Sequence, residues 1–194
     1  MARAGLTADR LTEAAAELAD EVGFGNVTVS ALARRFGVKD ASLYSHVKNA
    51  RDLRIRTSAL ALGELADRVA AALAGRSGKE ALVAFANAYR DYATGHPGRY
   101  AAAQLEIDPD SVAAEPARRH AALTRALLRG YGLAEPAETD AVRLLHSTFH
   151  GYVSLERGGG FSHQARGADA SWNAVLDALD LTLRQWPTGS GRKT

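Results

Sequence analysis

The chain has 194 residues, of which 46% are hydrophobic and 24% charged, and its formal net charge is +2. This size allows a buried core without disulfides, and the absence of cysteine excludes thiolate nucleophiles, iron–sulfur clusters and zinc sites with Cys ligands. No apolar run approaches the ~18 residues of a membrane span, and no apolar segment near the start resembles a signal peptide. We therefore expect a cytoplasmic globular protein that does not cross a membrane.

Helix-favouring residues dominate the chain, with 40 alanines and 23 leucines against 11 valines and two isoleucines. Since alanine and leucine favour helices and β-branched residues favour strands, the composition predicts an all-α fold. The first predicted helix covers residues 8–22, where apolar side chains recur at helical spacing, with Thr7 as N-cap and Gly23 beyond its end.

Two short helices joined by a tight turn come next. The first begins after Thr28, a natural N-cap, and ends before Gly37, which supplies a left-handed turn position. The second is predicted over residues 40–47, and Ala33 is small where the two helices approach each other most closely. This order of a small residue, a glycine and an apolar residue (Ala33, Gly37, Leu43) is typical of a helix-turn-helix, although an ordinary αα-hairpin can show the same spacing.

Positive charge is concentrated in this part of the chain. Residues 30–56 contain seven Lys or Arg and two Asp or Glu, a net charge of +5, whereas residues 57–194 contain fifteen of each sign. Such a local excess favours a surface that meets phosphate, with a solvated basic face as the alternative. If Leu43 and Val47 point inward, a set of residues suited to base edges and phosphates points outward: Asp40, Ala41, Ser42, Tyr44, Ser45, His46 and Lys48.

The remainder of the chain is also predicted to be helical. Further helices are expected from a cap at Asn49 through Leu73, from a capping box at 77–80 through Tyr92, and over 97–104, 117–129, 137–157 and 170–186. A composition shift near Arg56 predicts a boundary between domains 1–56 and 57–186. A polar tail over 187–194 is expected to be disordered.

The segments TVSALARRFGV (28–38) and SLYSHVKN (42–49), followed by Asp52-Leu53, resemble the N-terminal domain of the TetR family of transcriptional regulators. The resemblance covers about residues 7–56. Phe149-His150-Gly151 is also similar to the Trp-His-Gly signature of one C-terminal subgroup, with Phe in place of Trp. The family resemblance implies an all-α homodimer of about nine helices. Its N-terminal helices would bind a pseudo-palindromic operator in double-stranded DNA, and its C-terminal domain would bind a small hydrophobic effector that releases a repressor.

The same resemblance implies which residues contact DNA. Phosphate contacts fall on Thr28, Tyr44, His46 and Lys48, which can donate hydrogen bonds or sit at a helix N-terminus. Base contacts fall on Ser30, Lys39, Asp40, Ala41 and Ser42. The founding member has a base-contacting Arg in place of Ser30, a base-contacting Gln in place of Asp40 and a Pro in place of Ala41. We expect Asp40 to cap its helix, the alternative being that it accepts a hydrogen bond from a cytosine amino group.

Aromatic side chains at helical spacing in the second domain indicate either a packed core or a small-molecule pocket. Several carry a polar tip, which suits an apolar cavity with a few hydrogen-bonding groups. His146 and His150 lie four residues apart, as in helical metal pairs, but without a Cys or a fixed third ligand we predict pocket or core histidines, and no metal or cofactor. The candidate effector-binding residues are Phe85, Tyr89, Tyr92, Tyr100, Gln104, His146, Phe149 and His150.

The last predicted helix carries one continuous apolar stripe, which either completes the core or meets a partner. Family architecture favours a partner, with the helix at 137–157 joining it in a four-helix interface. The candidate dimer residues are Trp172, Val175, Leu176, Leu179, Leu183 and Trp186.

No Ser/His/Asp spacing and no carboxylate pair in the sequence indicates catalysis. The sequence therefore predicts a ligand-responsive, DNA-binding transcriptional regulator that is not an enzyme. The alternative is an all-α enzyme or metal-binding protein that uses His146 and His150.

Overall fold

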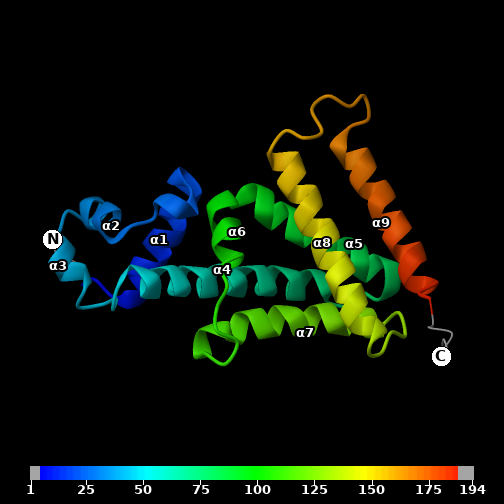
Figure 1. Ribbon diagram of the computed structural model, residues 1–194, viewed down its shortest axis with the longest axis horizontal. Helices are drawn as coiled ribbons and strands as arrows, with labels where there is room; N and C mark the ends of the chain where they lie inside the picture. Colours follow the sequence, from blue (N-terminus) through cyan, green and yellow to red (C-terminus); the bar gives the residue numbers. More distant parts are fainter. Residues whose placement is uncertain (1–4, 188–194) are drawn as a thin grey trace, which may run out of the picture. The chain divides into compact units, whose positions relative to one another are not determined.

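The computed structural model describes residues 5–187, and within that range it contains nine α-helices, two short 3₁₀ helices and no strand (Figure 1). The all-α prediction is confirmed. No helix in this range is both long and apolar enough to span a membrane. Most of the predicted tail at 187–194 lies outside the described residues. The elements are α1 (Ala8–Val22), η1 (Phe24–Asn26), α2 (Val29–Phe36), α3 (Asp40–Leu43), α4 (Ala50–Leu73), α5 (Gly78–Gly95), α6 (Pro97–Ala103), η2 (Val112–Ala114), α7 (Glu115–Arg129), α8 (Ala137–Arg157) and α9 (Ala168–Arg184).

Packing divides the chain into two compact units. Unit 1 comprises Met1–Asp67 and Gly95–His120, and unit 2 comprises Arg68–Thr94 and Ala121–Thr194. The division falls inside α4, and α6 belongs to the same unit as α1–α3. This division by packing does not test where the DNA-binding domain ends, so the boundary at residue 56 stays a prediction.

The predicted third helix is shorter than expected. α3 ends at Leu43, and residues 44–46 form turns. The hydroxyl of Ser45 donates to the carbonyl of Ser42 at 2.8 Å, and the backbone N–H of His46 bonds back only three residues, to Leu43, at 2.9 Å. The backbone therefore leaves the α-helical pattern after Leu43, although the buried Val47 continues the apolar spacing on which the longer prediction rested.

Helix α6 is joined to α1 by a carboxylate and by a very close backbone approach. Asp20, on α1, accepts hydrogen bonds from the backbone N–H groups of Gly98 and Arg99 at 2.8 and 2.9 Å. These N–H groups belong to the first turn of α6, where no intrahelical acceptor exists. A Cβ added at Gly98 would lie 1.9 Å from the carbonyl oxygen of Ala19. Only glycine therefore allows this contact between the two helices.

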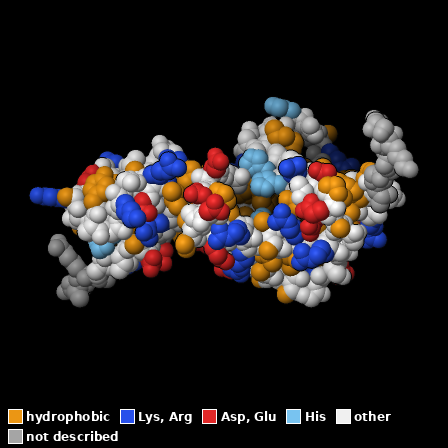
Figure 2. All heavy atoms as spheres, turned by 60° about the horizontal axis from the view of Figure 1, so that its bottom comes forward, with side chains coloured by type: hydrophobic (Ala, Val, Ile, Leu, Met, Phe, Trp, Pro, Cys, Tyr) orange, Lys and Arg blue, Asp and Glu red, His pale blue; other side chains and the backbone are white. Residues whose placement is uncertain are grey.

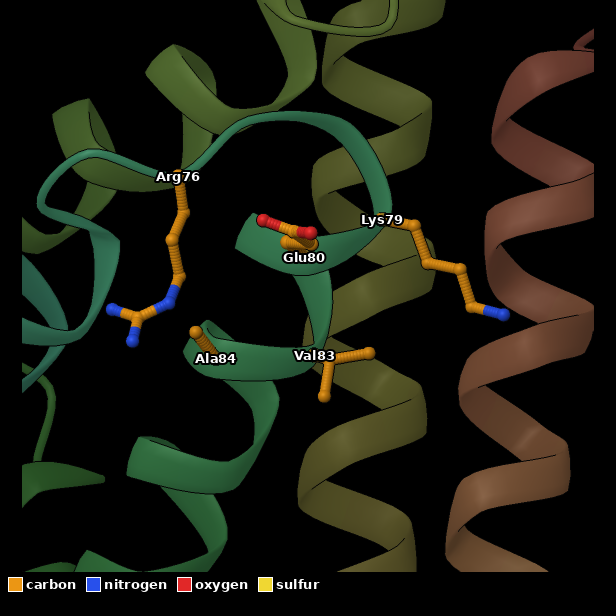
Figure 3. Close-up of a pocket in the computed structure, with 5 residues that line it drawn as sticks. All are labelled: Arg76, Lys79, Glu80, Val83 and Ala84. Carbon is orange, nitrogen blue, oxygen red and sulfur yellow. The ribbon is translucent and has the colours of Figure 1, made fainter.

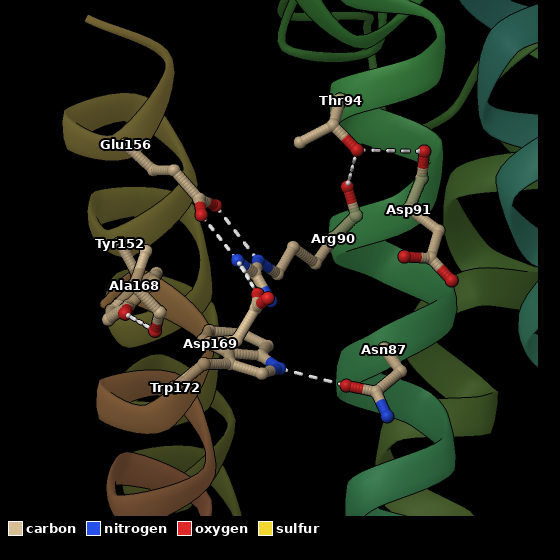
Figure 4. A network of polar contacts seen from close by, with 9 residues as sticks. All are labelled: Asn87, Arg90, Asp91, Thr94, Tyr152, Glu156, Ala168, Asp169 and Trp172. Atoms are coloured by element: carbon tan, nitrogen blue, oxygen red, sulfur yellow. Dashed lines mark hydrogen bonds and ion pairs between the residues drawn. The ribbon is translucent and has the colours of Figure 1, made fainter. Parts of the chain in front are cut away.

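Unit 2 contains a charged network around Arg90 of α5 (Figure 4). The guanidinium donates to both carboxylate oxygens of Glu156 on α8 and, at 2.8 Å, to Asp169 in the first turn of α9. It also lies over the ring of Trp172, 5.4 Å from its centroid, and the indole N–H of Trp172 donates to Asn87 at 2.8 Å. Hydrogen bonds to these two carboxylates raise the pKa of Arg90, although burial opposes the rise. Because the guanidinium of α5 binds residues of α8 and α9, it ties three helices together.

Gly98→Ala should lower the free energy of unfolding by at least about 2 kcal/mol, because the new methyl group overlaps backbone that cannot rotate away. The matched control is Gly63→Ala in α4, where a Cβ meets no atom within 4 Å. That control should leave stability unchanged or raise it, since alanine favours helix. Urea unfolding followed by circular dichroism measures both, and equal effects of the two substitutions would contradict the close approach.

Arg90→Leu should lower the free energy of unfolding by about 2–3 kcal/mol, because it leaves the carboxylate of Glu156, only 19% exposed, without its partner. Arg90→Lys should recover part of the loss, since an ammonium keeps the charge but not the paired geometry. Lys79→Ala, which breaks a surface ion pair to Asp177, is the control and should not shift the urea midpoint. A fully stable Arg90→Leu protein would show that the network is dispensable.

Candidate nucleic-acid interface

Helices α2 and α3 form a tight two-helix unit with a shared core. Leu32, Ala33, Leu43 and Val47 are all buried. Gly37 has a φ of 66°, the left-handed conformation that glycine adopts without strain, and it ends α2 as predicted. Because Leu43 and Val47 face the core, the other side of α3 is free to face a partner.

The predicted DNA-contacting residues lie mostly on the surface of this two-helix unit. Tyr44 is exposed although it is a large aromatic residue, whereas His46 is half-buried. The hydroxyl of Thr28 accepts a hydrogen bond from the backbone N–H of Ala31 at 3.1 Å, so it caps α2 as predicted. The remaining predicted residues are also exposed: Ser30, Lys39, Asp40, Ala41, Ser42 and Lys48.

The expectation that Asp40 caps α3 is wrong. The N-cap residue is Lys39, and no side chain caps this helix. The carboxylate of Asp40 instead accepts a hydrogen bond from the hydroxyl of Ser30, on α2. The two residues are ten positions apart, so no local pattern in the sequence could show that they pair.

Part of the basic segment serves the structure of unit 1. Arg35 binds Glu17 and Glu21 of α1 at 2.8 Å each, and the hydrogen bond to Glu21 is the main cause of its raised pKa. Arg54 lies over the ring of Phe24, 4.4 Å from its centroid. Counting charges along the sequence could not separate these arginines from those that face solvent.

Other cations near α2 and α3 are exposed. Arg34, Lys39 and Arg51 have no ion pair within residues 5–187. Cations without carboxylate partners are available to phosphate. Arg34 and Arg51 are therefore candidate phosphate contacts in addition to the predicted ones. Both belong to the segment over residues 30–56 whose excess positive charge indicated a phosphate-binding surface.

Hydrogen bonds at the start of α4 fix the chain at Lys48 and Asn49, which directly follow the exposed residues of the two-helix unit. The side-chain oxygen of Asn49 accepts from the backbone N–H of Asp52 at 2.9 Å, as predicted for a cap. The carboxylate of Asp52 accepts from the backbone N–H of Lys48 at 3.0 Å and from Arg56 at 3.1 Å. Burial tends to raise the pKa of Asp52, but these bonds outweigh it and the pKa is lowered. An ionised Asp52 thus holds the backbone of Lys48 in place.

The predicted effector-binding aromatics form a packed core in unit 2. Phe149 lies at its centre, with ring centroids 6.0 Å from both Phe85 and Tyr89 and 5.7 Å from Trp172. All four side chains, and that of Tyr92, are buried. Two further predicted members belong to unit 1: Tyr100 is buried on α6 and Gln104 is exposed at its end. The predicted set is thus not gathered in one unit.

His146 and His150 lie side by side on α8, with ring centroids 6.3 Å apart. Figure 2, in which histidines are pale blue, shows that histidine side chains are present on the face in view. His146 is exposed, but partial desolvation of its ring lowers its pKa, and nearby His150 lowers it further. Among residues 5–187, no three His, Cys, Asp or Glu side chains gather closely enough to hold a metal ion. The metal-binding alternative gains no support from this pair.

A shallow groove of about 360 Å³ lies at the start of α5, lined by Arg76, Lys79, Glu80, Val83 and Ala84 (Figure 3). None of these residues was predicted to bind an effector. Lys79 points from the groove toward α9, where its ammonium binds Asp177 at 2.7 Å.

The apolar stripe of α9 faces the core of its own chain. Trp172, Leu176, Leu179 and Leu183 are buried without any partner subunit. These four residues therefore complete the core of their own chain, which is the first of the two alternatives that the sequence left open. They do not form a free surface for a partner. Val175 is half-buried, and Trp186 lies beyond the end of α9 at Arg184.

The fold and the exposed helix-turn-helix define a protein of the DNA-binding class, and comparisons with known proteins give the family. Residues 11–55 match the family model for bacterial regulatory proteins of the tetR family, and residues 82–179 match a tetracyclin repressor-like C-terminal domain. An HTH-type transcriptional regulator of Mycobacterium tuberculosis, Rv0681, is 35% identical over 160 residues, covering 80% of this chain and 72% of the relative. Another, YobS of Bacillus subtilis, is 28% identical over 187 residues, covering 96% and 94%. The chain belongs to the TetR family of transcriptional regulators.

Solved structures share the fold. A protein of unknown function from Rhodococcus has a TM-score of 0.78 at 20% identity, covering 94% of this chain and 98% of that one. ActR of Streptomyces coelicolor in complex with actinorhodin has a TM-score of 0.69 at 20% identity, covering 93% and 97%. A TetR variant of Acinetobacter baumannii in complex with minocycline has a TM-score of 0.69 at 24% identity, covering 91% and 96%.

Proposed function

We propose that this regulator is a cytoplasmic homodimer that represses transcription from a pseudo-palindromic operator and is released by a small hydrophobic effector. The observation that carries the proposal is the exposed face of α2 and α3. It displays short polar, aromatic and basic side chains on a tight two-helix unit and on the turn that follows it, as major-groove binding requires. No catalytic activity is proposed.

We place the dimer contact on the outward side of α8 and α9. Leu155 in the last turn of α8 and Leu181 in the last turn of α9 are 56% and 54% exposed, so each helix presents an apolar side chain that a partner could cover. Ala174 and Ala178 are exposed on α9, and such small residues allow a second pair of helices to approach closely. This surface replaces the buried stripe as the candidate interface.

We place the effector in unit 2, around Phe149. Solved relatives with the same fold hold actinorhodin and minocycline, both polycyclic molecules that aromatic side chains can bind. Because Phe85, Tyr89 and Trp172 pack on Phe149 here, an effector must separate these rings to enter. Binding would therefore rearrange the core of the unit rather than fill an open site.

The chain topology offers a route from such a rearrangement to the DNA. Residues 95–120 of unit 1 are joined at both ends to unit 2, through α5 and α7. This segment includes α6, whose first turn is bound by Asp20 of α1. We propose that a change in unit 2 moves α6, and with it α1 and the helices packed on α1.

Lys48→Ala should weaken binding to all duplexes about equally and reduce the slope of log K against log salt by about one, because a phosphate contact carries no base information. Lys79→Ala removes the same charge from unit 2 and should leave the slope unchanged. Fluorescence anisotropy with a labelled duplex at several salt concentrations measures both variants. A Lys48→Ala protein with the wild-type slope would remove Lys48 from the interface.

Leu181→Glu should give a folded monomer with weak operator binding, because it places a charge in the proposed dimer contact. Leu179→Glu should instead unfold unit 2, since Leu179 is only 6% exposed in the single chain. Sedimentation mass and circular dichroism distinguish the two outcomes. A wild-type monomer, or a dimeric Leu181→Glu protein, would overturn this interface.

A further inference from the structure

Two residues on the DNA-facing side of the helix-turn-helix are bonded to each other. Ser30 lies in the first turn of α2 and Asp40 is the first residue of α3, and both are exposed. The hydroxyl of Ser30 donates its hydrogen bond to the Oδ2 atom of Asp40. One residue from each helix thus contributes to a single polar group on the surface.

This bond determines what the pair can offer to a partner. A serine hydroxyl has one hydrogen and two lone pairs, and an ionised carboxylate only accepts hydrogen bonds. Because Ser30 gives its hydrogen to Asp40, the Ser30 Oγ has only lone pairs left, and so does the Oδ1 of Asp40. The next residue, Ala41, adds no donor from its side chain. The pair is therefore an acceptor-only group that carries a negative charge.

The edges of the four base pairs differ in how they meet such a group. In the major groove only cytosine N4 and adenine N6 donate hydrogen bonds, whereas guanine N7 and O6 and thymine O4 are acceptors that repel a carboxylate. Adenine also presents its N7 acceptor beside the amino group, while cytosine presents a C–H at the corresponding side. An acceptor-only, charged group consequently favours cytosine over the other three bases.

We infer that Ser30 and Asp40 act together as a specificity element that selects a cytosine in each half of the operator. This inference rests on the proposed function, because it requires α2 and α3 to enter the major groove of duplex DNA. It differs from a purely structural role, in which the bond would only hold α2 against α3 and the preferred sequence would not depend on either residue.

The first experiment selects duplexes from a random pool with the full-length wild type and with two variants. The wild type should enrich a two-fold symmetric site with a conserved cytosine in each half. Asp40→Asn should shift that position toward adenine, because an amide both donates and accepts and so matches adenine N7 and N6. Lys48→Ala is the control and should select the wild-type sequence.

The second experiment replaces the selected cytosine by 2-pyrimidinone, which lacks the 4-amino group. Wild-type affinity should fall about fivefold to a hundredfold, the range for one specific base contact. Asp40→Ala should bind the two duplexes with nearly equal affinity, since its acceptor is already gone, and Ser30→Ala should show a reduced difference. The Lys48→Ala control should keep the full wild-type difference.

The outcomes separate this inference from the function on which it rests. If the wild type enriches a symmetric site but Asp40→Asn selects the same bases, or if Asp40→Ala shows the full wild-type loss with 2-pyrimidinone, the specificity element is wrong and the operator-binding function stands. If the wild type enriches no duplex, both fail. Circular dichroism of each variant confirms that it is folded before binding is compared.

Discussion

The contact between Asp20 and the first turn of α6 is the constraint on which the arrangement of unit 1 depends. A helix N-terminus presents backbone N–H groups without acceptors, and one carboxylate oxygen here accepts two of them. His96 and Arg99 also lie 3.4 Å from the same carboxylate. Since α1 packs against α2 as well as α6, its position determines where the helices of the proposed DNA-binding face lie.

Arginines of the chain have two different roles. Arg35 and Arg90 are each bound by two carboxylates and hold helices together. Arg34 and Arg51 have no ion pair within residues 5–187 and face solvent. A guanidinium that already binds two carboxylates gains little free energy from a phosphate. A solvated guanidinium that binds a DNA phosphate instead releases the counterions condensed on the DNA. The electrostatic footprint of the proposed DNA-binding face is therefore smaller than the basic segment that contains it.

Local signals in the sequence predicted most of the helices correctly. Thr28 and Gly37 bound α2 as expected, because capping and left-handed turns depend on residues within one turn of the helix end. The bounds of α8 also agree with the prediction. α3 was predicted too long, because the buried Leu43 and Val47 keep helical spacing although the α-helix ends at Leu43.

Contacts between residues far apart in the sequence could not be predicted in the same way. The bond from Ser30 to Asp40 and the ion pairs of Arg35 depend on how helices pack, and no periodicity encodes them. The stripe on α9 illustrates the same limit: a row of apolar residues shows that one face is buried, but not what buries it. Leu179 turned out to face its own core, and the exposed Leu181, off the stripe, marks the outward side.

The central claim is that two copies of the α2–α3 face bind one duplex around a two-fold axis. A hydroxyl-radical footprint of the wild-type protein on a duplex that it selects tests this claim most directly. We predict two protected segments on the same side of the helix, with centres roughly 34–36 Å apart or a multiple of that distance. A single uninterrupted protected segment, or two segments on opposite sides of the duplex, would contradict the two-fold arrangement.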